Sequence, residues 1–519
     1  MKKTLLGLAL ITGIIGGSNI FAQGYEIKVS IKNSKDSICL LTKYTWEQPY
    51  KVDTAKVDKA GNMTFKGKTA LEKGIYSIYS PKKGALYFDF IINESQKLTI
   101  TTDTVNFYDK MKIVGPKENT DFVEFVKFMG SKNLDRMNYE KEVKAKKTAD
   151  STKLMTAKTT ELFKDIRKYQ LDYLAKNPTN YISTIIRLQM DNDVPNAPKG
   201  IAAADTAIWK YQYYKNHYWD GINLNDIGTL NTNKIFAEKM KRYFEKVLIQ
   251  NPDSLAKESD IFIGKIGANK ETFKWVTHNL TYMSESSKVM GMDAFFVSMV
   301  DKYYKTGQAT WLDEKQLDKV IKRADILRHL LLGKKAQDLQ LIDTAGIKAI
   351  QKMGIDTIDD SQRLTNAYYK NQDAIQKLLV PMYGIKADYT VVVFWDVDCG
   401  HCKKEIPVIQ ETYHKLKKEG TSMEVFAVYT QHEYAKWKTF IKENKLDWIN
   451  VADAVHLNNL KEKYDIFSTP VIYILDKNKV IQAKRIGAEQ IEDVIKMLNK
   501  KNKNFSDTPQ FNNNTNNGK

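Results

Sequence analysis

Residues 394–407, Phe-Trp-Asp-Val-Asp-Cys-Gly-His-Cys-Lys-Lys-Glu-Ile-Pro, decide the fold of the chain around them. The first two end an apolar run, 390–395, which is typical of a strand buried on both faces of a sheet. The segment 400–418 that follows is predicted to be a helix. Cys399 and Cys402 therefore mark the point where a buried strand gives way to a helix.

This position gives the two cysteines different chemistry. Unpaired N–H groups and the helix dipole favour the thiolate of Cys399, and the thiolate is the attacking form in disulfide exchange. Cys402 lies one turn later on the same side, where it can attack a mixed disulfide made by Cys399. A Cys399–Cys402 disulfide would close a very small loop and stabilise the fold little, so a redox-active role is favoured.

The residues around the pair are expected to tune it. Gly400 permits a tight turn, and a protonated His401 would stabilise the thiolate and raise the reduction potential. Asp398 acts in the opposite direction, so reduction, oxidation and isomerisation of substrates all stay open. Glu405, one turn after Cys402, is a candidate proton carrier; the alternative is an exposed glutamate paired with a lysine.

A second segment, Thr469-Pro470, precedes a predicted strand at 471–475. An X-Pro bond can be cis, and a cis bond could turn the Thr469 backbone outward to pair with a substrate chain. Local sequence alone favours an ordinary trans bond.

Two other chemistries are disfavoured for the cysteine pair. Cys399, His401 and Cys402 lie too close together to surround a tetrahedral zinc ion, and no second C-x-x-C or H-x-x-x-H is present. A thiol peroxidase of this kind would need P-x-x-x-T/S-x-x-C, which the residues before Cys399 lack. We expect no metal and no cofactor beyond the Cys399–Cys402 disulfide itself.

Residues 388–499 resemble the thioredoxin-fold domain of the TlpA/ResA-like thiol-disulfide oxidoreductases. The resemblance rests on four motifs, which are Phe394-Trp395, Cys399-Gly400-His401-Cys402, Lys403-Lys404-Glu405-Ile406-Pro407 and Ser468-Thr469-Pro470-Val471. It implies that Cys399 is the nucleophile, that Cys402 is the resolving thiol and that Pro470 is a cis residue beside them. It further implies a functional carboxylate at Glu405.

From the same resemblance we expect Trp395, Thr469 and Pro470 to bind substrate. Two positions depart from the family pattern. Asp398 replaces the usual tryptophan before the first cysteine, and Val393 stands where cytosolic thioredoxins keep a buried aspartate. The front of the chain resembles uncharacterised β and helical domains fused to such modules in Gram-negative envelope proteins.

The sequence predicts a multidomain chain. Short alternating runs separated by turn residues predict an all-β sandwich of unknown function at 23–116. Helical periodicity predicts an all-α domain at 117–333. An α/β thioredoxin-like domain is expected at 334–500, with an insertion near 348–385. The Lys- and Asn-rich tail, 501–519, is expected to be disordered.

Residues 1–22 have the pattern of a secretory signal peptide. A basic start, Met1-Lys2-Lys3, precedes an apolar run at 5–15 that is too short to span a bilayer comfortably, and the expected cleavage follows Ala22. No later stretch is apolar enough for a membrane helix. The chain is therefore expected to be exported to the periplasm or cell envelope, without an integral membrane segment.

The net charge of +18 does not by itself indicate a nucleic-acid partner. Lysines alternate with acidic residues along the chain, which favours a solvated basic surface. We expect the partners to be protein disulfide or dithiol substrates and an envelope redox partner. No pattern specifies an oligomeric state.

The leading hypothesis is an exported enzyme that exchanges disulfides with proteins. The alternative from another class is a non-catalytic envelope binding or adaptor protein whose front domains bind a glycan, peptide or protein. The third cysteine, Cys39, lies in the apolar run 37–41 and is expected to be a buried free thiol. Its alternatives are an intermolecular bridge or an internal substrate of Cys399.

Overall fold

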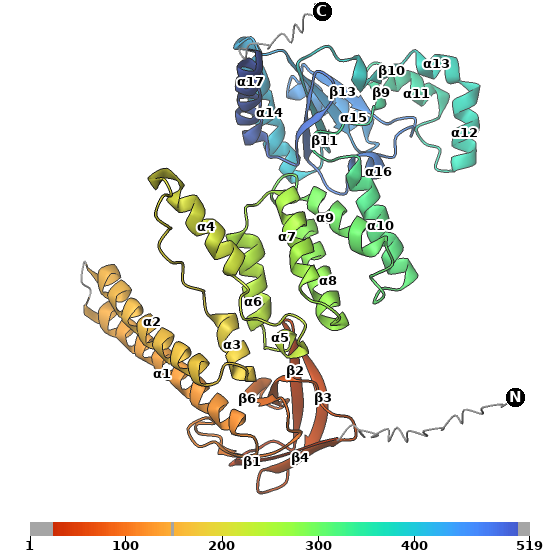
Figure 1. Ribbon diagram of the computed structural model, residues 1–519. Coiled ribbons are helices and arrows are strands. Elements are labelled where there is room, and N and C mark those ends of the chain that lie inside the picture. The colour runs from red at the N-terminus through yellow and green to blue at the C-terminus, as the bar shows by residue number, and fades with distance from the viewer. Residues whose placement is uncertain (1–23, 147–149, 507–519) are drawn as a thin grey trace, which may run out of the picture. The chain divides into compact units, whose positions relative to one another are not determined.

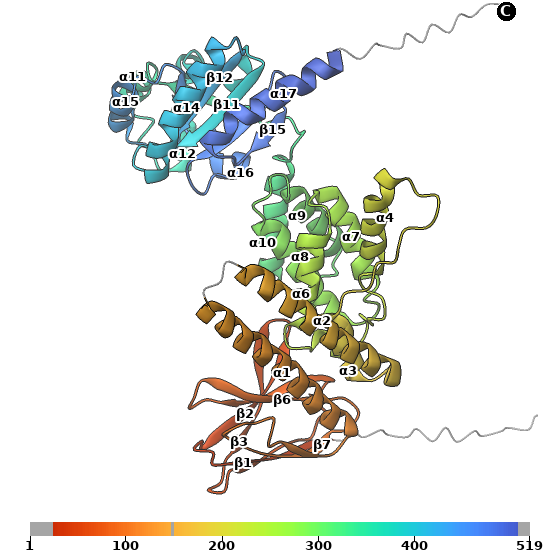
Figure 2. The same cartoon turned by 90° about the vertical axis from the view of Figure 1, so that its left-hand side faces the viewer.

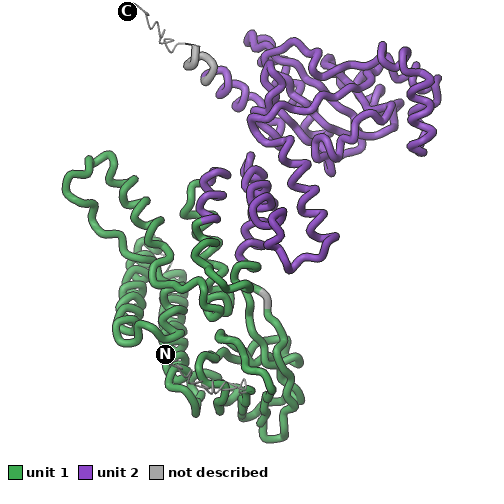
Figure 3. The backbone as a smooth tube through the Cα atoms, turned by 45° about the vertical axis from the view of Figure 1, so that its right-hand side comes forward, with its two compact units in different colours: residues 1–249, 261–275 green, residues 250–260, 276–519 purple. Residues whose placement is uncertain are grey.

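The computed structural model describes residues 24–146 and 150–506, which divide into two compact units (Figure 3). Within the described residues, one unit comprises 24–146, 150–249 and Ile261–Trp275, and the other comprises Gln250–Asp260 and 276–506. The predicted signal peptide, 1–22, lies outside the described residues. The segment predicted to be helical, 117–333, contributes to both units.

The first unit begins with the predicted β-sandwich (Figure 1). Its strands are β1 (Tyr25–Lys32), β2 (Ile38–Thr45), β3 (Gln48–Lys56), β4 (Asn62–Gly67), β5 (Gly74–Ser80), β6 (Ala85–Ile92), β7 (Lys97–Asp103) and β8 (Lys112–Val114). They form two four-stranded sheets, in the orders β4-β1-β7-β8 and β3-β2-β5-β6. Alternate residues of β1 are buried, as its polar–apolar alternation predicts. The inner faces share one core that includes Cys39.

The region after the sandwich is helical, as predicted. Its helices are α1 (Lys117–Lys146), α2 (Ser151–Lys176), α3 (Tyr181–Gln189), α4 (Thr206–His217), α5 (Ile227–Leu230), α6 (Ile235–Arg242), α7 (Pro252–Gly264), α8 (Lys270–Ser286), α9 (Asp293–Met299) and α10 (Glu314–Arg328). The predicted break at Asn251-Pro252 is the start of α7. Helices α9 and α10 belong to the second unit.

The C-terminal domain is an α/β fold around a seven-stranded sheet with the order β10-β9-β13-β12-β11-β14-β15. Its strands are β9 (Gln340–Asp343), β10 (Leu379–Pro381), β11 (Tyr389–Trp395), β12 (Met423–Tyr429), β13 (Ile449–Ala452), β14 (Val471–Asp476) and β15 (Ile481–Lys484). The interior strand β11 is parallel to β12 and antiparallel to β14. This mixture of parallel and antiparallel neighbours places the start of β14 beside the end of β11.

Helices cover this sheet. They are α11 (Ile347–Met353), α12 (Ser361–Lys370), α13 (Gln372–Gln376), α14 (Gly400–Lys418), α15 (Tyr434–Glu443), α16 (Leu460–Tyr464) and α17 (Ile491–Ser506). Helices α14 and α17 lie side by side in both views (Figures 1 and 2), and Lys415 of α14 pairs with Glu492 of α17. Helices α11 to α13 and strand β10 form the segment between β9 and β11.

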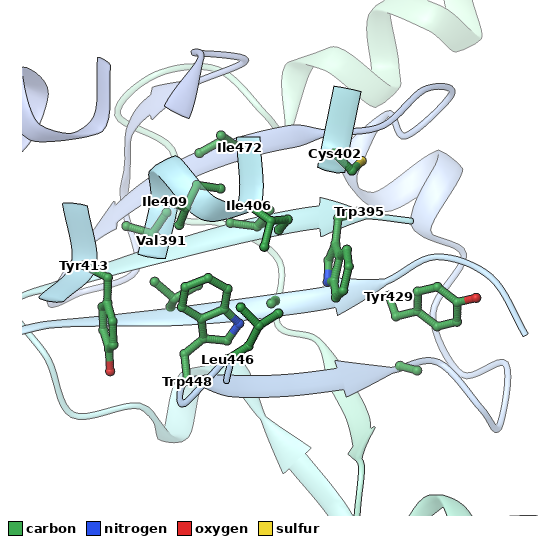
Figure 4. Close-up of a cluster of buried hydrophobic side chains, with 14 of the residues drawn as sticks. Val391, Trp395, Cys402, Ile406, Ile409, Tyr413, Tyr429, Leu446, Trp448 and Ile472 are labelled. Carbon is green, nitrogen blue, oxygen red and sulfur yellow. The ribbon is translucent and has the colours of Figure 1, made fainter. Parts of the chain in front are cut away.

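Every residue of β11 is buried, which confirms the expectation of a strand covered on both faces. Val391, Val393 and Trp395 contribute to one core cluster, shown in Figure 4, whereas Val392 and Phe394 contribute to a cluster on the opposite face. Because successive side chains of a strand point to opposite faces, a strand between two cores must be apolar throughout.

The C-terminal tail differs from expectation in its first residues. Helix α17 continues to Ser506, so residues 501–506 are helical where the sequence predicted disorder. Lysine is a good helix former, and no glycine or proline interrupts this part of the chain. Residues 507–519 lie outside the described part. Among the described helices, none combines the length and apolar character that crossing a membrane requires.

Candidate active site

The cysteine pair lies at the start of α14, which follows the interior strand β11. Cys399 is the residue that caps this helix, and its Sγ accepts a hydrogen bond from the backbone N–H of Cys402 at 3.4 Å. The backbone N–H of Cys399 itself donates to the Asp396 carbonyl at 3.3 Å. The sulfur therefore occupies the place where a helix offers unpaired N–H groups to a negative charge.

The predicted Thr469-Pro470 segment lies against this sulfur. The Cys399 thiol donates to the carbonyl oxygen of Thr469 at 3.2 Å, although the two residues are 70 positions apart. The Thr469–Pro470 peptide bond is cis, as the family resemblance implied. The structure thus brings together three predicted site residues, Cys399, Thr469 and Pro470.

The two thiols differ in acidity. Burial acts to raise the pKa of Cys399, but hydrogen bonds from the Thr469 side chain and from the Cys402 and His401 backbones outweigh it and lower the pKa below its ordinary value. Donation of the thiol proton to the Thr469 carbonyl is the one contact that favours the protonated form, and ionisation removes it. Cys399 is partly exposed, so its lowered pKa belongs to a sulfur that a substrate can reach.

Cys402 is the opposite case. Its side chain is buried, and Figure 4 shows it among the core side chains above Trp395. Burial raises the pKa of Cys402 to about 12, and the neighbouring Cys399 sulfur adds to the effect. Both residues are present as free thiols, which is the reduced form of the pair. In this form Cys399 is the more easily ionised sulfur and Cys402 holds its proton.

The two residues between the cysteines, Gly400 and His401, are both exposed. A Cβ placed on Gly400 would meet no heavy atom within 4 Å, and its φ lies outside the left-handed region, so the start of α14 does not require glycine. The chain enters α14 at Gly400 in an ordinary conformation, and the predicted tuning role of Gly400 stays a prediction. The His401 side chain is exposed in the first turn of α14.

Trp395 does not have the position that substrate binding requires. Its side chain is 0% exposed and packs against Tyr429 and Phe440 in the core beneath the cysteines. The prediction that it contacts substrate is wrong, because the Trp395 ring is enclosed in the core on its face of the sheet (Figure 4). Trp395 is instead part of the core against which the start of α14 packs.

Glu405 contacts a distant part of the chain. Its carboxylate accepts a hydrogen bond at 2.8 Å from the backbone N–H of Ala488, which begins a short 3-10 helix, η5 (Ala488–Gln490). This contact fixes η5 against α14. The predicted proton-carrying role of Glu405 toward Cys402 remains a prediction.

Asp398 forms an ion pair that the sequence did not reveal. Its carboxylate lies 3.2 Å from the ammonium group of Lys436 in α15, and both side chains are largely exposed. Lys436 also pairs with Glu433 at 2.6 Å. The negative charge that was expected to oppose thiolate formation is thus partly neutralised beside Cys399.

A pocket that the sequence patterns did not indicate lies beside Thr469. It has a volume of about 480 Å³, and three segments line it, which lie within 429–432, 453–461 and 466–469. The imidazole rings of His432 and His456 face each other there, with centroids 5.1 Å apart. Both histidines follow parallel strands, β12 and β13, whose carboxyl ends meet at one edge, and this pattern was the available signal.

No metal site accompanies these residues in the described ranges, 24–146 and 150–506, where no group of three or more His, Cys, Asp or Glu side chains is placed to hold an ion. A dithiol at the start of the helix that follows a buried interior strand, opposite a cis-proline, defines a thioredoxin-fold dithiol protein.

Comparison with known proteins gives the family. A model described as thioredoxin-like matches residues 387–481. Sporulation thiol-disulfide oxidoreductase A of Bacillus subtilis is 30% identical over 112 residues, which are 21% of this chain and 67% of that protein. Thiol-disulfide oxidoreductase ResA of Bacillus thuringiensis is 29% identical over 108 residues, or 20% of this chain and 60% of that protein. Through its C-terminal domain, the chain belongs to the thioredoxin-like thiol-disulfide oxidoreductases.

The front of the chain matches two domains of unknown function, DUF4369 at residues 25–122 and DUF5106 at 140–329. Among solved structures, a domain of a possible thiol-disulfide isomerase from Cytophaga hutchinsonii is 33% identical, with a TM-score of 0.26, and covers 34% of this chain and 97% of its own. A thioredoxin-like protein from Bacteroides caccae is 18% identical, with a TM-score of 0.43, and the match covers 59% of this chain and 98% of that protein.

Proposed function

We propose that the protein is an exported thiol-disulfide oxidoreductase that exchanges disulfides with protein substrates through Cys399 and Cys402. The observation that carries the proposal is the asymmetry of the pair. Cys399 is partly exposed, has a lowered pKa and caps a helix, whereas Cys402 is buried with a raised pKa. The Cys399 sulfur is suited to attack a substrate disulfide, and the Cys402 sulfur is suited to resolve the mixed disulfide that results.

The exchange needs no further reagent in the reducing direction. The Cys399 thiolate attacks one sulfur of a substrate disulfide, forms a mixed disulfide and releases the other substrate sulfur as a thiolate, which takes up a proton. Cys402 then loses its proton and attacks Sγ of Cys399. The second substrate sulfur leaves as a thiol, the substrate has gained two electrons, and the Cys399–Cys402 disulfide has formed. The reverse sequence oxidises a substrate dithiol.

The backbone beside Thr469 supports a polypeptide substrate. The carbonyl of Thr469 already accepts from the Cys399 sulfur, so a chain that reaches Cys399 also reaches this peptide group. Thr469 and the exposed Phe467 line the neighbouring pocket. An extended substrate segment would pair with the loop backbone and place side chains in the pocket.

Export and a redox partner complete the proposal. The signal-peptide pattern at residues 1–22 supports delivery to the periplasm or envelope. Each net reduction or oxidation of a substrate leaves the cysteine pair in the opposite redox state, so in either direction a second envelope dithiol or disulfide protein must restore it.

The test is the equilibrium of the pair with glutathione, read by thiol trapping. A mutual disulfide between Cys399 and Cys402 is expected, and it should disappear in Cys399→Ser. Cys402→Ser should accumulate a mixed disulfide with a protein substrate, whereas Cys39→Ala should behave as wild type. A pair that never forms a disulfide, or a Cys399→Ser variant with full exchange activity, would contradict the proposal. The alternative, a non-catalytic binding or adaptor protein, would then be favoured.

The same titration gives the direction of electron flow. A potential near that of thioredoxin, about −270 mV, indicates a reductase that needs an electron donor. A potential of about −180 to −120 mV indicates an isomerase or oxidase.

A further inference from the structure

The loop that presents Thr469 is anchored from outside the thioredoxin-like domain. Asp465 follows α16 and stands four residues before Thr469, with its side chain 0% exposed and a φ of +56°. Its carboxylate pairs with Arg323 of α10 through one oxygen and with Arg485 through the other. Helix α10 and the C-terminal domain belong to the same compact unit.

The two arginines hold the aspartate from different elements. Arg485 follows β15, donates to the Asp465 backbone carbonyl at 2.8 Å, and its own N–H donates to the Ile472 carbonyl of β14 at 2.8 Å. Arg323 comes from the helical region, where its Nε lies 3.5 Å from Glu285 of α8. A buried carboxylate requires such partners, because an unpaired charge in the interior is costly.

Arg323 also reaches the surface around the active site. Its guanidinium lies 5.9 Å from the centroid of the Phe467 ring, which is 69% exposed and lines the pocket beside Thr469. One helical side chain therefore contacts the loop at its buried start through Asp465 and at its exposed middle through Phe467. Two contacts of different kinds restrict both the position and the orientation of the loop.

A second buried link holds this part of the helical region in place. Lys484 of β15, 5% exposed, pairs with Asp293 of α9 and donates to the Leu330 carbonyl beyond α10. The Gly333 N–H donates to the Ile481 carbonyl at 2.9 Å. These contacts join α9 and the segment after α10 to β15. They therefore hold α10, which carries Arg323, in place relative to the loop.

We propose that Arg323 is a positioning residue for polypeptide substrates: helix α10 sets the place of the 465–470 loop, and so of the Thr469 backbone, relative to Cys399. The inference rests on the proposed function, in which that loop pairs with the substrate chain. It gives part of the helical region a role in the reaction. Disulfides without a peptide backbone do not pair with the loop, so Arg323 should affect them only through the contact of Thr469 with the Cys399 sulfur, and therefore much less.

The test compares two disulfides in the full chain. The reduced protein is mixed with insulin, a polypeptide disulfide, or with cystamine, a small one, and the loss of free Cys399 is followed by quenched thiol trapping. Arg323→Met should lower the second-order rate constant for insulin roughly tenfold, because a displaced loop misplaces the substrate chain, and should lower that for cystamine much less. Arg323→Lys keeps the positive charge but lacks the planar guanidinium group. Its rate constant for insulin should lie between those of wild type and Arg323→Met.

The matched control is Lys322→Met, one residue earlier on α10, where the exposed lysine pairs with Asp318 of the same helix. It should match wild type for both disulfides. Unchanged insulin rates in both Arg323 variants would overturn the inference, as would an equal fall for insulin and cystamine. A wild-type protein that reacts with neither disulfide would instead refute the proposed function, and the inference with it.

Discussion

Cys39 and Cys399 place the same side chain in opposite surroundings. Cys39 lies in β2 at the centre of the sandwich core, where burial, helped by the charge of Asp36, raises its pKa to about 12. Cys399 caps α14, where hydrogen bonds to its sulfur overcome the effect of burial and lower its pKa. Two regions of one chain thus give one cysteine a raised pKa and another a lowered pKa.

The comparison shows that removal from water does not decide what a thiol does. Burial raises the pKa of Cys39 and acts in the same direction on Cys399. The difference comes from the groups that face each sulfur, which are apolar side chains around Cys39 and hydrogen-bond donors around Cys399. A buried Cys39 also disfavours the earlier alternatives of an intermolecular bridge or an internal substrate.

The largest expected effect is the contrast in alkylation. A pKa of about 12 leaves Cys39 about a thousandfold less thiolate than an ordinary cysteine with a pKa of 9.0, and its sulfur is also enclosed. In native protein at neutral pH, iodoacetamide should modify Cys399 at least about a thousandfold faster than Cys39. Peptide mass spectrometry over time measures both rates. Comparable rates would show that the sandwich core opens readily or that Cys399 is not activated.

The second expected effect is a loss of stability in alkaline solution. An unfolded Cys39 ionises above pH 9, whereas the folded thiol keeps its proton until about pH 12. The stability linked to it is complete below pH 9 and is lost as the pH rises through this window, by about 1.4 kcal/mol per pH unit. Cys39→Ala should therefore lose stability less steeply than wild type. Urea unfolding at pH 8 to 11 measures the slopes, and parallel slopes would contradict the raised pKa.

The sequence was enough to predict the element pattern around the cysteines. A strand between two cores must be apolar at every position, so 390–395 indicated both the fold and the place of Cys399. The apolar character of the whole strand also meant that the direction of the Trp395 side chain could not be predicted. Since both faces of β11 are covered, no alternation in the sequence showed that this ring would point into the core.

Contacts between distant segments could not be predicted. The spacing of Glu405 from Cys402 fixed its side of α14, but its partner, the Ala488 N–H, comes 83 residues later. The pairing of Asp465 with Arg323 spans 142 residues and joins two regions with different periodicity. A single sequence specifies local geometry through spacing, whereas such partners depend on how elements pack.

A third prediction separates the two roles of Glu405. Glu405→Gln keeps an acceptor for the buried Ala488 N–H and should retain stability, whereas Glu405→Ala leaves this donor unpaired and should cost about 1–2 kcal/mol in urea unfolding. If Glu405 carries protons for Cys402, Gln should also slow release of the mixed disulfide roughly a hundredfold. Equal release rates in wild type and Glu405→Gln would leave the carboxylate a purely structural role.

The smallest expected effect concerns Asp398, which sharpens the account of why Cys399 is reactive. Its negative charge next to the thiolate disfavours the reduced, ionised pair, but Lys436 lies 3.2 Å away and offsets it. Asp398→Asn should raise the reduction potential by only about 10 mV, the scale of exposed ion pairs. Lys436→Met should lower it by a similar amount, because Asp398 then acts alone. Glutathione equilibria at low and high salt measure both shifts, and high salt should reduce them. Shifts several times larger would mean that exposed charges, rather than the hydrogen bonds to Sγ, set the acidity of Cys399.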